Sequence, residues 1–161
     1  MARRAHHGFG MRIIFSDPYP PSAEESRALG AEQRASIEEV LAEADFVSLH
    51  CPATAETRHL MNPDRFRRMQ KHAFLINTAR GDVVDEAALV AALGAGTIAG
   101  AGLDVFEREP QVSAELVGME NVALLPHLGS ATLETRVAMG MRALENLQLF
   151  FAGQPVRDRV V

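Results

Sequence analysis

Three side chains are suited to binding and protonating a small acid. His127 follows Pro126 at the end of an apolar run, and histidine best donates and accepts a proton near neutral pH. Arg80 follows another apolar run, and its guanidinium can hold a carboxylate in a two-pronged pair. Glu109 precedes Pro110 in an extended or turning segment, and a carboxylate bonded to the far nitrogen of a histidine fixes its tautomer. Together these residue types favour acid–base chemistry on a carboxylate-bearing substrate.

Two further carboxylates end apolar runs. Asp17 follows Met11–Phe15, where an acidic residue in a dinucleotide-binding fold accepts hydrogen bonds from the adenosine ribose and repels the 2′-phosphate of NADP. Asp104 closes another such run. Structural alternatives stay open: both aspartates can form turns, Arg80 can cap a helix or lie on the surface, and His127 can be structural. All four residues nevertheless fall at the carboxyl ends of predicted strands, the edge where open α/β sheets bind ligands.

Short apolar runs alternate with amphipathic segments along the chain. The runs are continuous, as in strands of a parallel sheet whose two faces are both covered. Strands are predicted at Met11–Phe15, Phe46–Leu49, Ala73–Asn77, Ala99–Val105 and Val122–Leu125. Helices, several with a Ser, Asn or Asp N-cap, are predicted at Ala2–Phe9, Ser36–Ala44, Asn62–Met69, Asp85–Leu93 and Thr132–Phe151. This alternation favours an α/β fold with a doubly wound parallel sheet.

Composition narrows the class of protein. The 161 residues are 47% hydrophobic and 23% charged, which is ordinary for a globular domain with its own core. The net charge of −5 comes from charges of mixed sign, so nucleic acid is not an expected partner. The apolar runs are too short for a membrane span. The single cysteine, Cys51, favours a cytoplasmic setting, and no paired zinc-ligand spacing predicts a metal.

The motifs, taken in order, resemble the D-isomer-specific 2-hydroxyacid dehydrogenases. They are His50-Cys51-Pro52, Glu56-Thr57-Arg58-His59, Asn77-Thr78-Ala79-Arg80-Gly81 with Val84-Asp85, Gly102-Leu103-Asp104-Val105-Phe106 with Glu109-Pro110, and Pro126-His127-Leu128-Gly129-Ser130-Ala131-Thr132. Each motif is moderately specific, and the ordered set, which covers nearly the whole chain, is highly specific. The resemblance implies a Rossmann-like fold and hydride transfer between NADH and a small 2-oxo or 2-hydroxy acid.

The resemblance also implies a role for each site residue. Arg80 would bind the carboxylate and carbonyl of the substrate, His127 would exchange a proton with the carbonyl oxygen, and Glu109 would orient His127. Asp17 would bind the adenosine ribose, and Asp104 would accept a hydrogen bond from the nicotinamide amide. The rest of the NAD cleft would be formed by Cys51, Pro52, Thr78 and Gly129.

The chain departs from the family pattern at its start. Family members carry a Gly-x-Gly-x-x-Gly turn before the helix that corresponds to Ala2–Phe9, and this sequence contains no such turn. We therefore expect a partial dinucleotide-binding domain over residues 1–152, lacking its first strand and glycine loop. Residues 153–161 would form a C-terminal tail that returns to an absent substrate domain. A homodimer is one expected assembly, since the family often dimerises through this half.

Two other interpretations stay open. The chain could be a non-catalytic Rossmann fragment or interaction module, which the missing glycine loop favours. It could also be an unrelated α/β binding domain whose motifs match by chance. The identity of the 2-hydroxy acid is not encoded in these motifs, because the residues that select it belong largely to the family's other domain.

Overall fold

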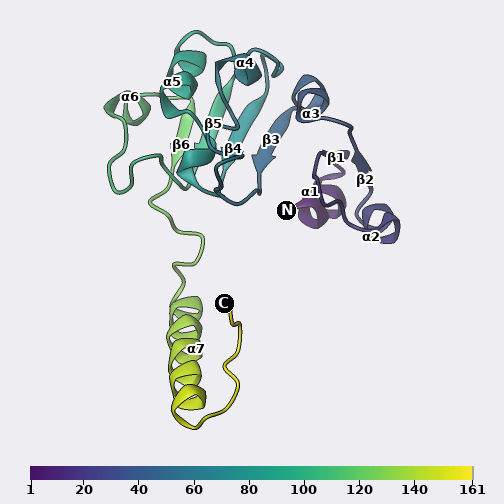
Figure 1. The fold of residues 1–161 in the computed structure, drawn as a ribbon. Helices are drawn as coiled ribbons and strands as arrows, with labels where there is room; N and C mark the ends of the chain where they lie inside the picture. The colour runs from purple at the N-terminus through teal and green to yellow at the C-terminus, as the bar shows by residue number, and fades with distance from the viewer. Residues whose placement is uncertain (161) are drawn as a thin grey trace. The chain divides into compact units, whose positions relative to one another are not determined.

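The computed structural model describes residues 1–160, which divide into two units between Leu124 and Leu125. The first unit holds the six strands of the described chain, and the second holds helix α7 (Leu133–Phe151). Figure 1 shows the course of the chain through the elements of each unit. Within residues 1–160, no helix combines the length and apolar character needed to cross a membrane.

The strands of the first unit form two parallel sheets rather than one. β1 (Ile13–Phe15) pairs with β2 (Ala31–Gln33). The larger sheet runs in the order β3 (Phe46–Leu49), β4 (Phe74–Asn77), β5 (Gly100–Leu103) and β6 (Val122–Leu124), as Figure 1 shows. β1 and β3 are thus edge strands of separate sheets, as expected for a sheet interrupted at this point. The five predicted strands are confirmed, with shorter bounds than predicted for all but β3.

Helices occupy most of the connections between strands. They are α1 (Ala2–Phe9), α2 (Ala23–Ala28), α3 (Ile37–Glu43), α4 (Pro63–Phe66), the short 3₁₀ helix η1 (Gly81–Val83), α5 (Glu86–Gly94) and α6 (Ala114–Val117). The predicted N-caps are confirmed: Ser36, Asn62 and Asp85 each accept a hydrogen bond from a backbone N–H of the first turn. The prediction that α4 reaches Met69 is wrong. Its last residues close through i to i+3 bonds, such as Met69 N–H to Phe66 O, and form turns instead.

Two elements between β1 and α3 were not predicted, because their residues are polar. α2 is a charged helix that begins with a capping box between Ser22 and Glu25. β2 has the sequence Ala-Glu-Gln and is largely exposed, so it shows neither an apolar run nor an alternating pattern. β2 forms because its backbone pairs with that of β1, and backbone hydrogen bonds of this kind cannot be predicted from its side chains.

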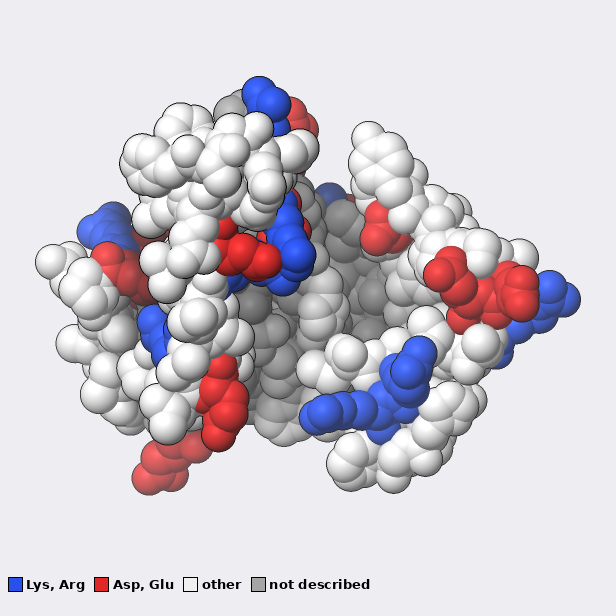
Figure 2. All heavy atoms as spheres, turned by 90° about the horizontal axis from the view of Figure 1, so that it is seen from below, with Lys and Arg blue, Asp and Glu red and all other residues white. Residues whose placement is uncertain are grey.

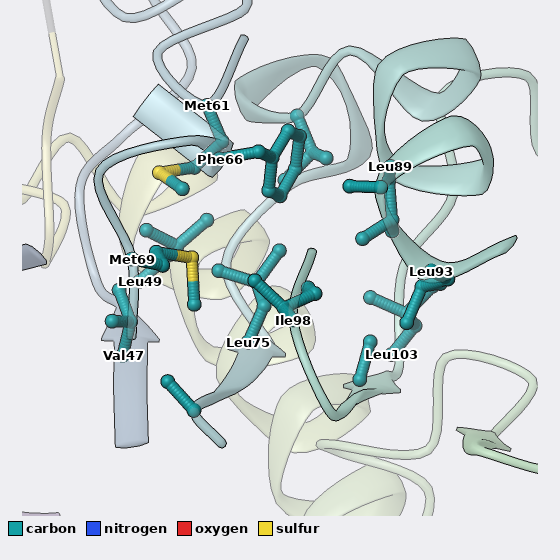
Figure 3. Close-up of a cluster of buried hydrophobic side chains, with 14 of the residues drawn as sticks. Val47, Leu49, Met61, Phe66, Met69, Leu75, Leu89, Leu93, Ile98 and Leu103 are labelled. Atoms are coloured by element: carbon teal, nitrogen blue, oxygen red, sulfur yellow. The ribbon is translucent and has the colours of Figure 1, made fainter. Parts of the chain in front are cut away.

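The core lies on one face of the four-stranded sheet. Leu75 of β4, Leu89 of α5 and Phe66 of α4 are at most 1% exposed, and Figure 3 shows side chains from these elements and β3 pointing toward one another. The opposite face is less covered: Phe46 is 54% exposed, and its ring stacks on that of Phe74 with centroids 5.5 Å apart. The expectation of a sheet buried on both faces is therefore wrong for β3. Val47 and Leu49 enter the core, while Phe46 packs on a neighbouring ring and Ser48 is only partly buried.

An exposed charge network links the two-stranded sheet to α3. Arg34 Nε donates to Glu43 Oε1 at 2.7 Å, and Arg12 Nη2 lies 3.0 Å from Glu43 Oε2. Hydrogen bonds from Arg34 first, and then from Arg12, lower the pKa of Glu43 to about 2. On the face seen in Figure 2, basic and acidic side chains likewise lie close to one another, as the mixed charges of the sequence suggest.

The Glu43 network should make stability depend on pH. We expect Glu43→Gln to lower the urea midpoint at neutral pH, because the carboxylate that both arginines contact is lost. The folded pKa of about 2 lies below the reference value of 4.5, so the stabilisation is full above 4.5 and disappears as the pH falls toward 2. Urea unfolding of wild type and variant across this range measures the difference. A gap that persists at pH 2, or that Glu120→Gln outside the network reproduces, would contradict this origin.

Candidate active site

A groove forms where two neighbouring strands end. In the parallel register Leu49, Asn77 and Leu103 are level with one another, so the segments that follow β3, β4 and β5 leave the sheet at the same edge. The groove has a volume of about 580 Å³ and is lined by His50, Cys51, Pro52, Ala53, Thr78, Ala79 and Arg80. The structure thus brings together four of the predicted site residues from two motifs. This is the edge at which open α/β sheets bind ligands.

The side chain of Asn77 fixes the loop that carries Thr78 and Arg80. It is buried, and its amide Nδ2 donates to Arg80 O at 2.9 Å while Oδ1 accepts from Ala79 N–H at 3.1 Å. Its backbone oxygen also accepts from Asp104 N–H at 3.0 Å. The buried amide of Asn77 therefore closes the loop on itself, while the backbone oxygen of the same residue joins the ends of β4 and β5. The exposed Arg80 guanidinium donates from Nη1 to Ala79 O at 2.6 Å, at the start of its own loop.

The loops after β4 and β5 touch through their backbones. A Cβ placed on Gly81 would lie 1.9 Å from Phe106 O and 2.5 Å from Glu107 N, so only glycine permits this contact. Glu109 lies on the second of these loops, and its Oε1 accepts from Phe106 N–H at 3.0 Å. Asp104 lies at the start of the same segment and is 5% exposed. The contact at Gly81 therefore sets the distance between the Arg80 loop and the Glu109 loop.

Burial favours the neutral forms of two titratable groups of the groove. Burial lowers the pKa of His50, and its Nε2 lies 2.9 Å from Ser48 Oγ. Burial also raises the pKa of the Cys51 thiol above its usual value. A protonated thiol is a poor nucleophile, so Cys51 is suited to form a small apolar wall. The groove consequently presents one cationic side chain, Arg80, beside uncharged neighbours.

The remaining predicted residues lie outside this groove. Asp17 follows β1 in the two-stranded sheet, is exposed, and accepts a hydrogen bond from Tyr19 N–H at 2.8 Å, so the turn-forming interpretation applies to it. His127 and Gly129 belong to the second unit, in the segment before α7, whose N-cap is Thr132. His127 is exposed and has a φ of 53°, in the left-handed region that few residues other than glycine adopt.

Metal ligands do not gather in the part of the chain that the structure covers. Among residues 1–160, no three His, Cys, Asp or Glu side chains are arranged to hold a metal ion. The chemistry of the groove is instead that of a guanidinium, a threonine hydroxyl and backbone groups at a strand edge.

Comparison with known proteins identifies the family. The model for the NAD-binding domain of the D-isomer specific 2-hydroxyacid dehydrogenases matches residues 1–129, well over half of the chain. The chain belongs to this family. The predicted family is thereby confirmed, as is an α/β fold with parallel strands that resembles Rossmann-type NAD-binding domains.

Relatives of this dehydrogenase domain include enzymes named for glyoxylate. The chain is 50% identical over 155 residues to the glyoxylate reductase of Thermococcus kodakarensis, covering 96% of this chain and 45% of that protein. It is 47% identical over 148 residues to glyoxylate/hydroxypyruvate reductase B of Serratia proteamaculans, covering 91% and 45%. The chain spans about half the length of the curated relatives it matches.

Solved structures of the family superpose closely on the chain. The holo form of Rhodotorula graminis D-mandelate dehydrogenase gives a TM-score of 0.91 at 41% identity, covering 97% of this chain and 46% of that one. The NADPH-dependent glyoxylate/hydroxypyruvate reductase of Sinorhizobium meliloti, in complex with NADP and malonate, gives 0.85 at 38% identity, covering 98% and 51%. The family model is described as an NAD-binding domain, and one member of the family is described in complex with NADP.

Sequence reasoning missed two residues that organise this dehydrogenase domain. Asn77 and Gly81 were part of a recognised motif, but no role was assigned to either. A signal for Asn77 existed, since a lone amide ends an otherwise apolar strand. No local signal marks Gly81, because its neighbour is the backbone of Phe106, 25 residues farther along the chain.

Proposed function

We propose that this chain is the nucleotide-binding part of an NAD-dependent reductase that converts a small 2-oxo acid, with glyoxylate as the first candidate, into the 2-hydroxy acid. The observation that carries the proposal is the groove after β3 and β4, where Cys51, Pro52, Thr78 and Arg80 lie together. The names of the relatives support the substrate class, because several are glyoxylate or glyoxylate/hydroxypyruvate reductases.

The residues of the groove fit the nicotinamide end of the cofactor. Their side chains are small or apolar apart from a hydroxyl, an imidazole and one cation, which suits an uncharged heteroaromatic ring with its ribose. Cys51, Pro52 and Thr78 would line the ring, Asp104 would accept from its amide, and Gly129 would leave room beside it. When bound, reduced nicotinamide supplies the hydride. The protein supplies position and the proton.

The catalytic roles follow from the chemistry of three side chains. Arg80 would pair with the substrate carboxylate, for which its planar fork is well matched and a lysine is not. His127 would donate a proton to the carbonyl oxygen and take it back in the reverse direction. Glu109 would accept from His127 and favour its protonated form. The Phe106 N–H that holds Glu109 Oε1 supports this role, because it restricts the carboxylate to few orientations.

We further propose that Asp17 selects NAD over NADP. A carboxylate at this place accepts hydrogen bonds from the ribose hydroxyls and repels a 2′-phosphate. The Sinorhizobium relative is described as NADPH-dependent, so a preference for NAD is not a property of the whole family and would have to be set by residues of this chain such as Asp17.

The test is fluorescence titration of the purified chain with NADH and NADPH, together with NADH oxidation in the presence of glyoxylate. Asp17→Ala should weaken NADH binding by roughly 10- to 100-fold, since a hydrogen bond to a charged group contributes about 1.5–3 kcal/mol. Asp17→Asn is the matched control, because its amide oxygen can still accept from Tyr19 N–H and keep the turn. Asn should relax the preference against NADPH without disturbing the turn. Equal binding of NADH and NADPH by wild type would exclude the proposed selection.

The proposed organisation places a partial dinucleotide-binding domain at residues 1–152 and a tail at 153–161 that returns to a substrate domain. A homodimer and a cytoplasmic setting belong to the same proposal. The doubly wound sheet would lack its first strand and glycine-rich loop, which is supported by the separation of β1–β2 from β3–β6.

A second candidate function is a non-catalytic nucleotide-binding or interaction module. It is favoured by the separation of the β1–β2 sheet from the β3–β6 sheet. The two candidates differ in turnover. NADH binding without glyoxylate-dependent oxidation would favour the module, and oxidation that requires both NADH and the oxo acid would favour the reductase.

A further inference from the structure

We propose that His59 and Glu107 are positioning residues that hold the Arg80 loop and the Glu109 loop in one fixed arrangement. This inference rests on the proposed function, which gives Arg80 and Glu109 their roles. Neither His59 nor Glu107 lines the groove after β3 and β4. Both would therefore act through the two loops and not through the substrate or the nucleotide.

His59 contacts both loops at once. Its backbone N–H donates to Asp82 O at 2.8 Å, just beyond the Arg80–Gly81 turn. Its side-chain Nε2 lies 2.9 Å from Glu107 Oε1, and because a carboxylate only accepts, Nε2 is the donor. The backbone of His59 has a φ of 50°, so the residue is kept in an uncommon conformation that presents both groups. One residue thus ties the segment after β4 to the segment after β5.

Glu107 is the centre of this network. Its backbone N–H donates to Glu86 Oε2 at 3.1 Å, and its own Oε2 accepts from Glu86 N–H at 3.4 Å, so the two glutamates bond reciprocally. Arg58 Nη2 lies 3.7 Å from Glu107 Oε1. The Glu107 side chain is only 18% exposed, whereas the acidic side chains of the other described ion pairs are 37% exposed or more. Partial burial strengthens such bonds and makes an unpaired carboxylate costly, so the arrangement is well determined.

The consequence for the site follows from the loop geometry. Glu109 is two residues from Glu107, and its carboxylate is held by Phe106 N–H immediately before Glu107. In the other loop, Gly81, which directly follows Arg80 in the chain, packs against the Phe106 carbonyl. A shift of Glu107 would therefore move both Glu109 and the turn that carries Arg80. Rates are sensitive to such shifts, since a misplacement of about 1 Å can cost roughly 10² in rate.

The test compares His59→Leu with His59→Gln in the full chain. Both side chains lack a ring and place the same demand on the backbone, but only glutamine keeps an N–H donor at a reach similar to Nε2. We expect His59→Leu and Glu107→Ala to lower kcat for glyoxylate reduction about tenfold with KM for NADH unchanged, and His59→Gln to recover most of the loss. His72→Leu is the control, because His72 Nε2 lies 2.6 Å from an oxygen of Asp45 in an exposed pair. These two residues lie just before β4 and β3 begin, at the other end of the strands from the groove.

Amide hydrogen exchange provides a readout that needs no turnover. In His59→Leu and Glu107→Ala, the amides of Phe106 and Glu107 should exchange faster than in wild type, while those of β4 keep their protection. If exchange became faster by the same factor throughout the chain, the network would contribute only to overall stability, and the proposal would be overturned. Unchanged exchange together with unchanged kcat would overturn it as well. A wild-type chain that does not reduce glyoxylate would count against the proposed function alone, and local exchange would then decide whether His59 and Glu107 position the two loops.

Discussion

Replacement of His127 with asparagine should lower kcat for glyoxylate reduction by about 10²–10⁴-fold, the usual contribution of a general acid. An amide can donate a hydrogen bond to the carbonyl oxygen, but it has no proton to transfer near neutral pH. Asparagine is the appropriate replacement because His127 has a φ of 53°, and asparagine is among the residues that tolerate this conformation. The loss should therefore report chemistry and not a change of backbone.

The measurement is steady-state NADH oxidation at saturating glyoxylate, accompanied by a fluorescence titration with NADH. The Kd for NADH should be the same in wild type and variant, because the proposed role of His127 lies in proton transfer. The plot of kcat against pH should show the titration of a general acid in wild type, and this titration should be missing from the plot for the variant. Retention of full kcat by His127→Asn would remove His127 from the mechanism, whatever the affinity for NADH.

Substitution of Gly81 by alanine should cost about 3 kcal/mol of stability, at the upper end for an overpacked site. The new Cβ would meet Phe106 O at 1.9 Å and Phe106 C at 2.0 Å, and backbone atoms cannot rotate away as a flexible side chain can. For a domain of this size the change corresponds to a fall in Tm of roughly 6–12 °C. Relief of the clash would also separate the Arg80 loop from the Glu109 loop, so kcat/KM for glyoxylate should fall as well.

Gly94→Ala is the matched control for this substitution. Gly94 is the last residue of α5, and nothing lies within 4 Å of the Cβ that alanine would add. Alanine is the better helix former, so this variant should be as stable as wild type or more stable. Thermal unfolding followed by circular dichroism measures both. A Gly81→Ala protein with wild-type Tm would show that the two loops can separate freely, and it would also weaken the positioning role inferred for Glu107.

Much of the site could be anticipated from sequence, though not how its parts meet. The end of β4 was predicted at Asn77, and Arg80 was recognised as the cation that follows it, because an apolar run with a polar end is a local pattern. The role of the Asn77 amide was not predicted, since it depends on where the next three residues turn. Likewise His59 was quoted only as part of the Glu56-Thr57-Arg58-His59 motif and was given no role, because its partner Glu107 is 48 residues away.

The sequence by itself determined five of the strands, the helices α1, α3, α4, α5 and α7, the order of these elements and the family. Apolar runs, N-caps such as Asn62 and the ordered motifs are all readable within a few residues, and local hydrogen bonds enforce them. Only the tertiary structure decided that β1 pairs with β2, that Phe46 stays exposed, and that Gly81 touches Phe106. These contacts join segments separated by whole crossover connections. Parallel pairing gives no signal in either strand alone, because its register is a property of the assembled sheet.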